Sequence, residues 1–551
     1  MGGLLDDARA WADADPDDDT RTELRELIAS AEGGDAAALA ELEDAFAGTL
    51  QFGTAGLRGK LGPGPNRMNL VVVARAAAGF ARYLGERGGG AVVIGYDARS
   101  KSDLFARVTA EIMTGAGLRA MVLPEALPTP VLAFAIRHLG CAGGVMVTAS
   151  HNPPQDNGYK VYLGDGSQIV PPADAEISGH IADVTALGPV ADLPHGDEWE
   201  TLGDDVVASY VARATTLLEP GPPASVRIAY TAMHGVGGQV FVRVLREAGF
   251  AAPRVVAEQF APDGAFPTVA FPNPEEPGAM DLAIATAAGS DVDLIIAHDP
   301  DADRCAVGVP TPDGWRMLTG DEVGTLLGWW IASGNRRVAR RGVLAESIVS
   351  SSLLAEIAAD FHLAYAQTLT GFKWIARVPD LMFGYEEALG YCVDPNGVRD
   401  KDGITAALMI VEMATRMLYK GRTLTDVLDD IALQHGVYAT SQVSVRVSDL
   451  SRIAEVMSAL RTTPPASVAG VPVASFEDLE EGADGLPPTD GLRFTLASGA
   501  RIIVRPSGTE PKVKCYLQSV VPVVHDDLIA ARAQAGSELR AMAADVARWL
   551  E

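Results

Sequence analysis

Three carboxylates spaced two residues apart follow an apolar stretch near the middle of the chain. Asp299, Asp301 and Asp303 come directly after the segment DLIIAH. Carboxylates at this spacing can converge on one hard cation if the loop curls around it. An EF-hand loop is excluded, because its sixth and twelfth positions require Gly and Glu and are occupied here by Arg304 and Pro310. A solvated acidic turn is the alternative, but the apolar strand before it favours a metal site.

A serine and a histidine stand at the end of another apolar strand. The segment TASHNPPQDNGYKVY (Thr148–Tyr162) carries Ser150 and His151 onto a loop that is interrupted by prolines and a glycine. Loops at the carboxyl ends of parallel strands are the usual ligand sites of α/β sheets. A serine with a basic neighbour in such a position can carry a phosphoryl group. A plain strand-ending turn is the alternative, which Asn-Pro and Asn-Gly also favour.

The segment VRPSGTEPKVK (Val504–Lys514) runs from a strand into a turn rich in hydrogen-bond donors. Such a turn resembles an anion-binding nest, although a surface turn with incidental hydroxyl groups has the same pattern. The candidate phosphate ligands in this segment are Arg505, Ser507, Gly508, Thr509 and Lys512.

Two further segments offer groups for a sugar phosphate. FGYEEALGY (Phe383–Tyr391) has Glu386 and Glu387 at a strand end, where carboxylates commonly bind sugar hydroxyl groups; a buried helix-capping pair is the alternative. FGTAGLRG (Phe52–Gly59) is a flexible glycine-rich loop that offers Arg58 to an anion. A serine, a metal cradle, a hydroxyl-binding loop and a phosphate nest together describe phosphoryl transfer on a sugar.

Lysine is scarce in this chain, with 8 residues against 36 arginines. Lysine can lose its proton when it is desolvated, whereas arginine effectively cannot. The bias hints at a role for the lysines in or beside the segments above, although chance survival explains it equally well. These lysines are Lys160, Lys373, Lys401, Lys512 and Lys514.

Composition narrows the class of protein. The 551 residues suffice for several domains, and the apolar fraction of 48% is ordinary for a globular chain. The net charge of −28 argues against nucleic acid as a partner, because phosphate contacts need clustered Lys and Arg. The four cysteines form no CxxC pair, the acidic N-terminus is no secretory signal, and no apolar run is long enough to span a membrane. We therefore expect a cytoplasmic protein with no membrane partner.

The elements that must position these segments alternate between helices and short apolar strands. Residues 1–50 have the pattern of amphipathic helices, and from Asn69 to Ser150 helices alternate with strands such as AVVIGYD and GVMVTAS. The same rhythm returns over residues 225–309 and 320–420, which predicts α/β layers with mostly parallel pairing. From about Tyr438 the strands VSVRV, LRFTLA, RIIVRP and KVKCYLQSV frame two helices. We predict an α/β fold with three similar mixed α/β domains and a smaller C-terminal α+β domain.

The ordered motifs resemble those of the α-D-phosphohexomutase superfamily, the phosphoglucomutases and phosphomannomutases. TASHNP, DPDADR, GYEEALG and RPSGTEPK occur in the expected order across nearly the whole chain. The extended N-terminus, FGTAGLRG and TAMHGVGG (Thr231–Gly238) look most like the longer-chain branch, which includes phosphoglucomutases and enzymes acting on pentose 1-phosphates. The resemblance implies four domains around a central cleft. We expect them at residues 1–205 with the phosphoserine loop, 206–317 with the metal loop, 318–433 with the sugar loop and 434–551 with the phosphate loop.

The same resemblance implies the catalytic and metal-binding residues. Ser150 would carry the phosphoryl group, and that phosphate would share a Mg²⁺ ion with the three aspartates of the DPDADR motif, Asp299, Asp301 and Asp303. Lys160 is a candidate general acid or base. The reacting groups would be surrounded by Arg58, His151 and Lys160.

The substrate-binding residues follow from the resemblance in the same way. Arg304 would lie beside the phosphoserine and Lys373 would face the sugar, whose hydroxyl groups Glu386 and Glu387 would bind. The non-reacting phosphate would be held by Arg505, Ser507, Gly508, Thr509 and Lys512.

The implied reaction is an intramolecular phosphoryl transfer between hexose 1-phosphate and hexose 6-phosphate, with glucose or mannose as the hexose. The phosphoserine gives its phosphoryl group to the substrate, the resulting sugar 1,6-bisphosphate turns over in the cleft, and the serine takes back the other phosphate. The implied partner is thus a small phosphosugar, and we expect a monomer or a dimer.

One position departs from the hexose-specific pattern. Many such relatives have a serine in the sugar loop where this chain has Ala388. A phosphopentomutase or a sugar 1,6-bisphosphate synthase of the same superfamily is therefore an open alternative. A phosphatase with an aspartyl nucleophile is disfavoured because Asp303 is followed by Arg304 rather than by the Gly of its DxDG motif, and a silent sugar-phosphate binder would not need the intact Ser150.

Overall fold

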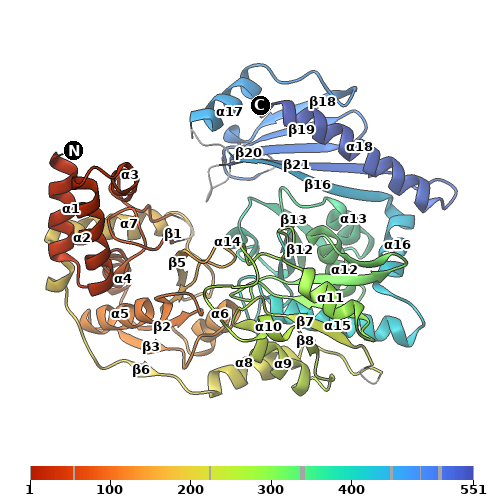
Figure 1. Cartoon of the computed structure of the whole chain (residues 1–551). Helices are drawn as coiled ribbons and strands as arrows, with labels where there is room; N and C mark the ends of the chain where they lie inside the picture. Colours follow the sequence, from red (N-terminus) through yellow and green to blue (C-terminus); the bar gives the residue numbers. More distant parts are fainter. Residues whose placement is uncertain are drawn as a thin grey trace. The chain divides into compact units, whose positions relative to one another are not determined.

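Four β-sheets organise the part of the chain that the structure describes, and helices accompany each of them (Figure 1). The computed structural model describes residues 2–53, 56–222, 225–334, 342–446, 451–483, 485–506 and 512–549. The chain divides into two units, Met1–Met317 with Gly390–Glu412, and Leu318–Leu389 with Met413–Glu551. The fold is mixed α/β with four sheet-bearing domains, which confirms the predicted fold class.

The chain begins with three helices that share a small core. The buried side chains of Ala8, Leu24 and Leu42 belong to this core. Asp17 and Asp35 accept hydrogen bonds from backbone N–H groups in the first turn of the second and third helices, which fixes where each helix begins. The amphipathic helices predicted for residues 1–50 are thus confirmed as α1 (Gly2–Ala14), α2 (Asp18–Glu32) and α3 (Ala36–Ala45).

The first sheet has a parallel centre and an antiparallel edge. Its strand order is β1-β5-β4-β2-β3-β6, in which β4, β2, β3 and β6 run parallel and β5 and β1 are added antiparallel. The strands are β1 (Leu57–Lys60), β2 (Ala91–Tyr96), β3 (Arg119–Val122), β4 (Gly143–Val147), β5 (Asp156–Leu163) and β6 (Glu200–Thr201). The helices of this part of the chain are α4 (Leu70–Gly85), α5 (Ser102–Gly115), α6 (Thr129–His138), α7 (Ala173–Leu187), the short η1 (Val190–Asp192) and α8 (Asp205–Thr215).

The segment after Ser150 is shorter than the loop that the sequence predicted. The chain returns as β5, antiparallel to β4, so that Lys160 pairs with Met146. The turn signals of Asn157 and Gly158 are overridden because six consecutive residues of β5 are buried between its neighbouring strands and the core. Arg58 likewise lies on a strand, β1, rather than in a flexible loop.

The second sheet belongs to the same unit, and the acidic loop connects two of its strands. Its strand order is β11-β10-β9-β7-β8; β9, β7 and β8 are parallel, and β10 and β11 are added antiparallel. The strands are β7 (Ile228–Thr231), β8 (Arg254–Val255), β9 (Leu294–Ala297), β10 (Ala306–Thr311) and β11 (Gly314–Met317). The accompanying helices are α9 (Gly237–Glu247), α10 (Ala257–Phe260) and α11 (Asp281–Ala288).

The third sheet begins the second unit. Its strands β13, β12 and β14 are neighbours in this order and run parallel. A capping box formed by Thr319 and Glu322 starts the first helix of this unit. The elements are α12 (Gly320–Ala332), β12 (Val343–Ser347), α13 (Leu353–Asp360), β13 (Ala364–Thr368), α14 (Phe372–Ile375), β14 (Leu381–Glu386) and α16 (Leu424–His435). The strand β15 (Gly390–Cys392) belongs to the first unit, and α15 (Gly403–Tyr419) begins there and ends in the second.

The fourth sheet is antiparallel throughout its described strands, as expected of an α+β domain. Its order is β16-β21-β20-β19-β18-β17, and its buried face packs against α17 and α18 through side chains such as Phe494, Met457 and Met542. The elements are β16 (Val437–Arg446), α17 (Ser451–Thr462), β17 (Ser467–Val468), β18 (Val471–Asp478), η2 (Leu479–Glu481), β19 (Leu492–Leu496), β20 (Arg501–Pro506), β21 (Lys512–Val521) and α18 (Leu528–Trp549). Among the described residues, no helix has the length and apolarity needed to cross a membrane.

The pairing of β5 with its two neighbours depends on a glycine. A Cβ atom at Gly158 would lie 2.5 Å from the carbonyl oxygen of Thr148 and 3.0 Å from that of Leu57, both backbone atoms. We expect Gly158→Ala to lower the Tm by about 4 °C or more, because the strands must separate. The matched control is Gly179→Ala in α7, where an added Cβ meets nothing within 4 Å and the Tm should stay equal or rise slightly. Equal Tm values for both variants in a thermal unfolding experiment would contradict this view of β5.

Candidate active site

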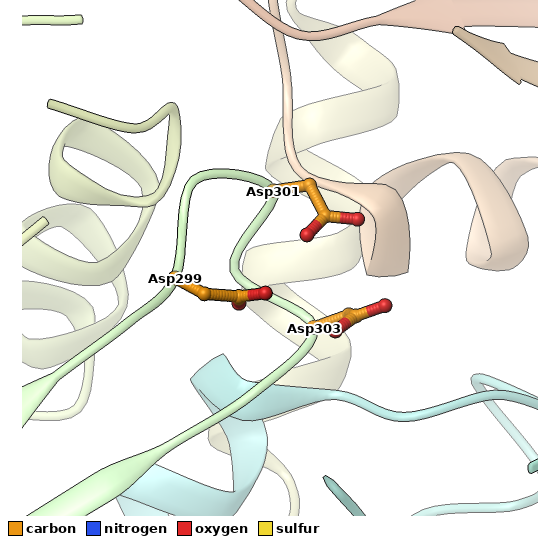
Figure 2. Close-up of side chains that lie close together, drawn as sticks. All are labelled: Asp299, Asp301 and Asp303. Atoms are coloured by element: carbon orange, nitrogen blue, oxygen red, sulfur yellow. The ribbon is translucent and has the colours of Figure 1, made fainter. Parts of the chain in front are cut away.

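The three predicted aspartates lie together on one curled loop after β9. Figure 2 shows that the side chains of Asp299, Asp301 and Asp303 project to the same side of this loop. Each offers an oxygen that lies within 4.8 Å of the oxygens offered by the other two, and all three residues are buried. Two backbone hydrogen bonds within the first unit hold the loop, since the N–H of Val236 donates to the carbonyl of Pro300 and that of Thr129 to the carbonyl of Asp301. The sequence prediction of a convergent carboxylate cluster is confirmed.

Two lysines offset the negative charge of this cluster. The Nζ atom of Lys160 lies 2.7 Å from Oδ2 of Asp301 and 3.0 Å from Oδ2 of Asp303, and Nζ of Lys401 lies 3.2 Å from the latter atom. Burial opposes ionisation of Asp303, but Lys160 and Lys401 hold its pKa below the ordinary value. Burial and the charges of Asp301 and Asp303 instead raise the pKa of Asp299 well above its ordinary value.

The cluster retains carboxylate oxygens that fit a metal ion. Within the described part of the chain, Oδ1 of Asp301 and Oδ1 of Asp303 are buried and have no hydrogen-bond partner. A buried hydrogen-bond acceptor without a partner destabilises the folded protein. Carboxylate oxygens that are grouped in this way are well suited to bind a hard divalent cation. The donor set therefore fits Mg²⁺.

Ser150 follows β4 in a left-handed backbone conformation, with φ of 52°. Its backbone N–H donates to Oγ1 of Thr148 at 2.9 Å, which supports a turn that a non-glycine residue rarely adopts. The Oγ atom of Ser150 lies 3.0 Å from Oδ2 of Asp299 and 3.2 Å from Nδ1 of His151. Burial, together with the nearby guanidinium groups, lowers the pKa of His151 well below 6.5, so this imidazole is neutral at pH 7. A buried hydroxyl thus stands between a neutral imidazole and the carboxylate cluster.

A buried arginine fastens the serine loop. The guanidinium of Arg99 donates to the carbonyl oxygens of Ser150, Asn152, Pro153 and Asp156 at 2.5–3.1 Å. The backbone N–H of Arg99 in turn donates to Asp97 Oδ1 at 3.0 Å. One side chain thus binds four carbonyl oxygens of the loop, in addition to the backbone hydrogen bonds from Asn152 to Ala149 and from Asp156 to Pro153.

Two further arginines point to the same region of the first unit. Nη1 of Arg58 donates to Oδ1 of Asn152 at 3.2 Å, beside the serine loop. The backbone N–H of Arg304 donates to Oδ1 of Asp299 at 3.1 Å, and its Nε lies 3.9 Å from Oδ2 of the same carboxylate. The guanidinium groups of both arginines thus lie beside the loops that contain Ser150 and the three aspartates.

The predicted sugar-binding residues lie in the second unit. Glu386 is the last residue of β14 and is buried, and Glu387 begins the turn after it. The carboxylate of Glu387 accepts hydrogen bonds from the hydroxyl groups of Ser347 and Ser350. Lys373 lies on α14 with its Nζ 5.7 Å from the centre of the Trp374 ring.

The predicted phosphate loop is described only at its two ends. Arg505 lies near the end of β20 and pairs with Lys514 of β21, which begins at Lys512. Ser507, Gly508 and Thr509 lie outside the described residues.

Four family models match the chain in order. They are the phosphoglucomutase/phosphomannomutase alpha/beta/alpha domain I over residues 49–187, domain II over residues 208–313, domain III over residues 319–434 and the C-terminal domain over residues 443–533. The chain belongs to the phosphoglucomutase/phosphomannomutase family. The superfamily that its motifs resembled is thereby confirmed.

Individual relatives of this family cover most of the chain. A "Probable phosphomannomutase" of Haemophilus influenzae is 51% identical over 82% of this chain and 93% of its own length. The human phosphopentomutase is 33% identical over 95% of this chain and 94% of its own, and a phosphoglucomutase of Staphylococcus haemolyticus is 34% identical over 86% and 91%. A crystal structure from Thermus thermophilus that is titled as a phosphomannomutase matches with a TM-score of 0.71 and 26% identity, over 91% of this chain and 99% of that one.

Family membership makes this chain a phosphosugar mutase, an isomerase that transfers a phosphoryl group on a sugar phosphate. The two alternative functions, a phosphatase with an aspartyl nucleophile and a sugar-phosphate binder without activity, are therefore not needed to explain the site. In the first unit, the structure brings half of the predicted site residues around one acidic loop: Arg58, Ser150, His151, Lys160, Asp299, Asp301, Asp303 and Arg304.

Sequence reasoning left three contacts of this site unassigned. Arg99 clamps the serine loop, Lys401 reaches Asp303, and Thr129 donates from Oγ1 to Asp301 Oδ2 at 2.6 Å. The scarcity of lysine marked Lys401 as unusual but assigned it no partner. No pattern in the sequence distinguishes Arg99 among the many arginines or Thr129 among the threonines.

Proposed function

We propose that this family member interconverts hexose 1-phosphate and hexose 6-phosphate through a phosphorylated Ser150 and a sugar 1,6-bisphosphate intermediate. The observation that carries the proposal is the buried Ser150 hydroxyl, 3.0 Å from Asp299 and 3.2 Å from the neutral His151. A structural serine needs neither the left-handed backbone nor an acidic cluster beside it.

Mg²⁺ is the cation that we propose for the cluster. The phosphate on Ser150 and the carboxylates of Asp299, Asp301 and Asp303 would hold it, and the buried oxygens of Asp301 and Asp303 that lack hydrogen-bond partners support this set. When bound, the ion supplies positive charge that offsets the charge of the transferred phosphoryl group.

In the first transfer, the free hydroxyl of the sugar phosphate attacks the phosphorus on Ser150. The new bond joins the sugar oxygen to phosphorus, the bond from phosphorus to Oγ breaks, and the hydroxyl proton passes from the sugar by way of neutral His151 to the departing Oγ, which becomes the Ser150 hydroxyl again. Lys160 is protonated, because Asp301 and Asp303 outweigh the effect of burial and raise its pKa. Its ammonium group, with Arg58 and Arg304, would stabilise the negative oxygens rather than accept the proton in this state. Neutral His151 beside Oγ is suited to exchange protons with the serine.

In the second transfer, Ser150 takes the other phosphoryl group from the bisphosphate. The Oγ–H proton passes to His151 as the bond from Oγ to phosphorus forms, and the sugar oxygen leaves with a proton. Lys160, as an ammonium ion, is the candidate acid for that oxygen, and proton exchange with solvent then restores neutral His151 and protonated Lys160 for the next cycle.

Residues of the second unit would bind the part of the substrate that does not react. Glu386 and Glu387 accept hydrogen bonds from several directions, which suits a sugar that must bind in two opposite orientations. Lys373 would face the sugar. Arg505 and Lys512 would bind the non-reacting phosphate together with Ser507, Gly508 and Thr509.

Glucose or mannose is our first choice of sugar, and the 51% identical relative named as a phosphomannomutase supports it. A phosphopentomutase is the alternative, favoured by the human phosphopentomutase that aligns over 95% of this chain and by Ala388, which brings no hydroxyl group to the sugar loop. A sugar 1,6-bisphosphate synthase of the same superfamily is a further alternative with the same phosphoserine chemistry.

Removal of the carrier hydroxyl tests the phosphoserine. Ser150→Ala should reduce mutase turnover at least about a thousandfold, because the variant lacks the hydroxyl group that is proposed to carry the phosphate. Intact mass of the purified wild type should show a phosphorylated fraction that the variant lacks. Ser167→Ala, which removes another buried hydroxyl on the turn after β5, is the control and should stay active. Near-normal turnover of Ser150→Ala without added bisphosphate would rule out the carrier role.

Removal of one carboxylate charge tests the metal site. Asp301→Asn should raise the Mg²⁺ concentration for half-maximal activity roughly tenfold or more, since a charged ligand is lost from a buried site. The control is Asp394→Asn, which also alters a buried carboxylate of the first unit but one that accepts from the guanidinium of Arg213. The control should keep the wild-type Mg²⁺ titration. If Asp301→Asn kept it as well, the three aspartates of the acidic loop would be structural only.

The sugar choice is tested at Ala388. We expect turnover of glucose 1-phosphate with side activity on mannose or pentose 1-phosphates. Ala388 has no hydroxyl group that a poorly matching sugar would leave buried without a hydrogen-bond partner, so such a sugar is not strongly rejected. Ala388→Ser should narrow the range. The measurement is kcat/KM for glucose, mannose, ribose and deoxyribose 1-phosphates with both proteins. A wild type restricted to one sugar by about a thousandfold, or an unchanged profile of the serine variant, would refute this expectation.

A further inference from the structure

An open pocket of the first unit lies at the far end of α6 from the acidic loop. Its volume is about 410 Å³, and small-molecule sites commonly have about 300–1,000 Å³. Thr129, the first residue of α6, contacts Asp301, whereas Arg137 and His138 stand in the last turn, about 12 Å further along the helix axis. The pocket is thus separate from the proposed catalytic groups. The side chains that line it include those of Phe134, Arg137, His138, Ser209, Arg213 and Asn396.

The two arginines of this pocket keep N–H groups that have no partner in the protein. Arg137 donates only through Nη1, to the carbonyl oxygens of Pro395 at 3.0 Å and Asn396 at 2.6 Å, which leaves its Nε and Nη2. Arg213 holds the carboxylate of Asp394 through Nε at 2.8 Å and Nη2 at 2.7 Å, which leaves its Nη1. Structural contacts therefore occupy only part of each guanidinium group.

Two neutral side chains add further donors to the same pocket. Within the part of the chain that the structure describes, the hydroxyl of Ser209 and the imidazole of His138 make no hydrogen bond to the protein. Neither these groups nor the remaining arginine N–H groups are buried. A ligand in the pocket can therefore accept hydrogen bonds from four different side chains.

Positive charge is in excess around this pocket, although the chain as a whole has a net charge of −28. Arg213 is paired with Asp394, and Nη1 of Arg399 lies 3.9 Å from Oδ2 of Asp165. Among the described residues, Arg137 has no carboxylate partner of this kind. Burial and the charge of Arg399 lower the pKa of Arg137, and the opposing effect of the two aspartates does not cancel this. A bound anion would offset the excess charge.

We propose that this pocket is a binding site for a phosphate group, carried by a small phosphate monoester or present as inorganic phosphate. A phosphate group has three terminal oxygens, so it matches donors from several side chains better than a carboxylate with two oxygens does. The rings of Phe134 and His138 stack with their centres 5.0 Å apart, and they offer a flat wall for the carbon part of an ester. The site is independent of the phosphoserine and of the sugar that the enzyme converts.

The first experiment adds a negative charge to the pocket without removing an arginine. Binding of radiolabelled inorganic phosphate to the full-length wild type, Ser209→Asp and Ser209→Asn is measured by equilibrium dialysis. Ser209→Asp places a carboxylate among the donors and should raise the Kd of the pocket at least about tenfold. Ser209→Asn is the matched control, because it has the same size and a similar helix propensity but no charge, and it should bind within about twofold of the wild type.

The comparison of the two variants decides the proposal. Equal phosphate binding by the wild type and Ser209→Asp would overturn it, as would an equal loss of binding in both variants. Phosphate bound at the proposed catalytic site is common to all three proteins, so the difference between them reports on the pocket. Values of kcat and KM in phosphate-free buffer should stay within about twofold of the wild type. A loss of kcat that matched the loss of phosphate binding would show that the substitution acts on the catalytic site, and the proposal would be wrong.

A second pair of variants tests the arginine that lacks a carboxylate partner. Arg137→Gln should raise the Kd for phosphate about tenfold or more, since a charged donor is lost. Arg82→Gln is its control, because Arg82 also stands in the last turn of a helix of the first unit but is exposed and does not line the pocket. Equal binding by the two variants would contradict the assigned role of Arg137.

Displacement of the label identifies the chemical class of the ligand. Glycerol 2-phosphate, a phosphate monoester that is not a sugar 1-phosphate, unlabelled inorganic phosphate and acetate are compared as competitors on the wild type. Displacement at lower concentration by the ester than by inorganic phosphate would assign the site to a phosphorylated metabolite, and equal displacement would assign it to free phosphate. Acetate should displace the label at least about tenfold more weakly than either phosphate. If acetate were equally effective, the pocket would not select phosphate, and the proposal would be overturned.

Discussion

The burial of three carboxylates in one loop is the constraint on which the rest of the first unit depends. Asp299, Asp301 and Asp303 have 0% exposed surface, and unpaired charges in such a place are very unfavourable. Lys160 and Lys401 therefore have to reach the loop from different parts of the chain, one from β5 and one from the segment before α15. The return of β5 beside β4 is required for this, because it brings Lys160 to the acidic loop.

The same electrostatic balance explains why this loop keeps its shape. The ammonium group of Lys160 bridges Asp301 and Asp303, and the backbone N–H of Arg304 and the hydroxyl of Ser150 both donate to Asp299. A divalent cation would add a further charge to a site whose carboxylates are already gathered. The repulsion between the carboxylates is thus offset by contacts within the folded protein.

Much of the fold and of the site could be predicted from local patterns. The aspartate triplet follows an apolar strand, and the strand-helix alternation is a property of neighbouring residues, so both were visible in the sequence. The strand β5 was not, since Asn157 and Gly158 favour a turn locally and the pairing with β1 and β4 depends on distant residues. The contacts of Arg99, Thr129 and Lys401 were missed for the same reason, because each joins residues that are far apart in the chain.

The clamp formed by Arg99 has a consequence for how this loop can evolve. All four of its acceptors are backbone carbonyl oxygens, of Ser150, Asn152, Pro153 and Asp156. Every amino acid supplies such an oxygen, so these four hydrogen bonds place no demand on the side chains of the residues that accept them. Mutation of these residues can therefore alter the chemistry beside the serine while the four hydrogen bonds from Arg99 to the main chain are kept.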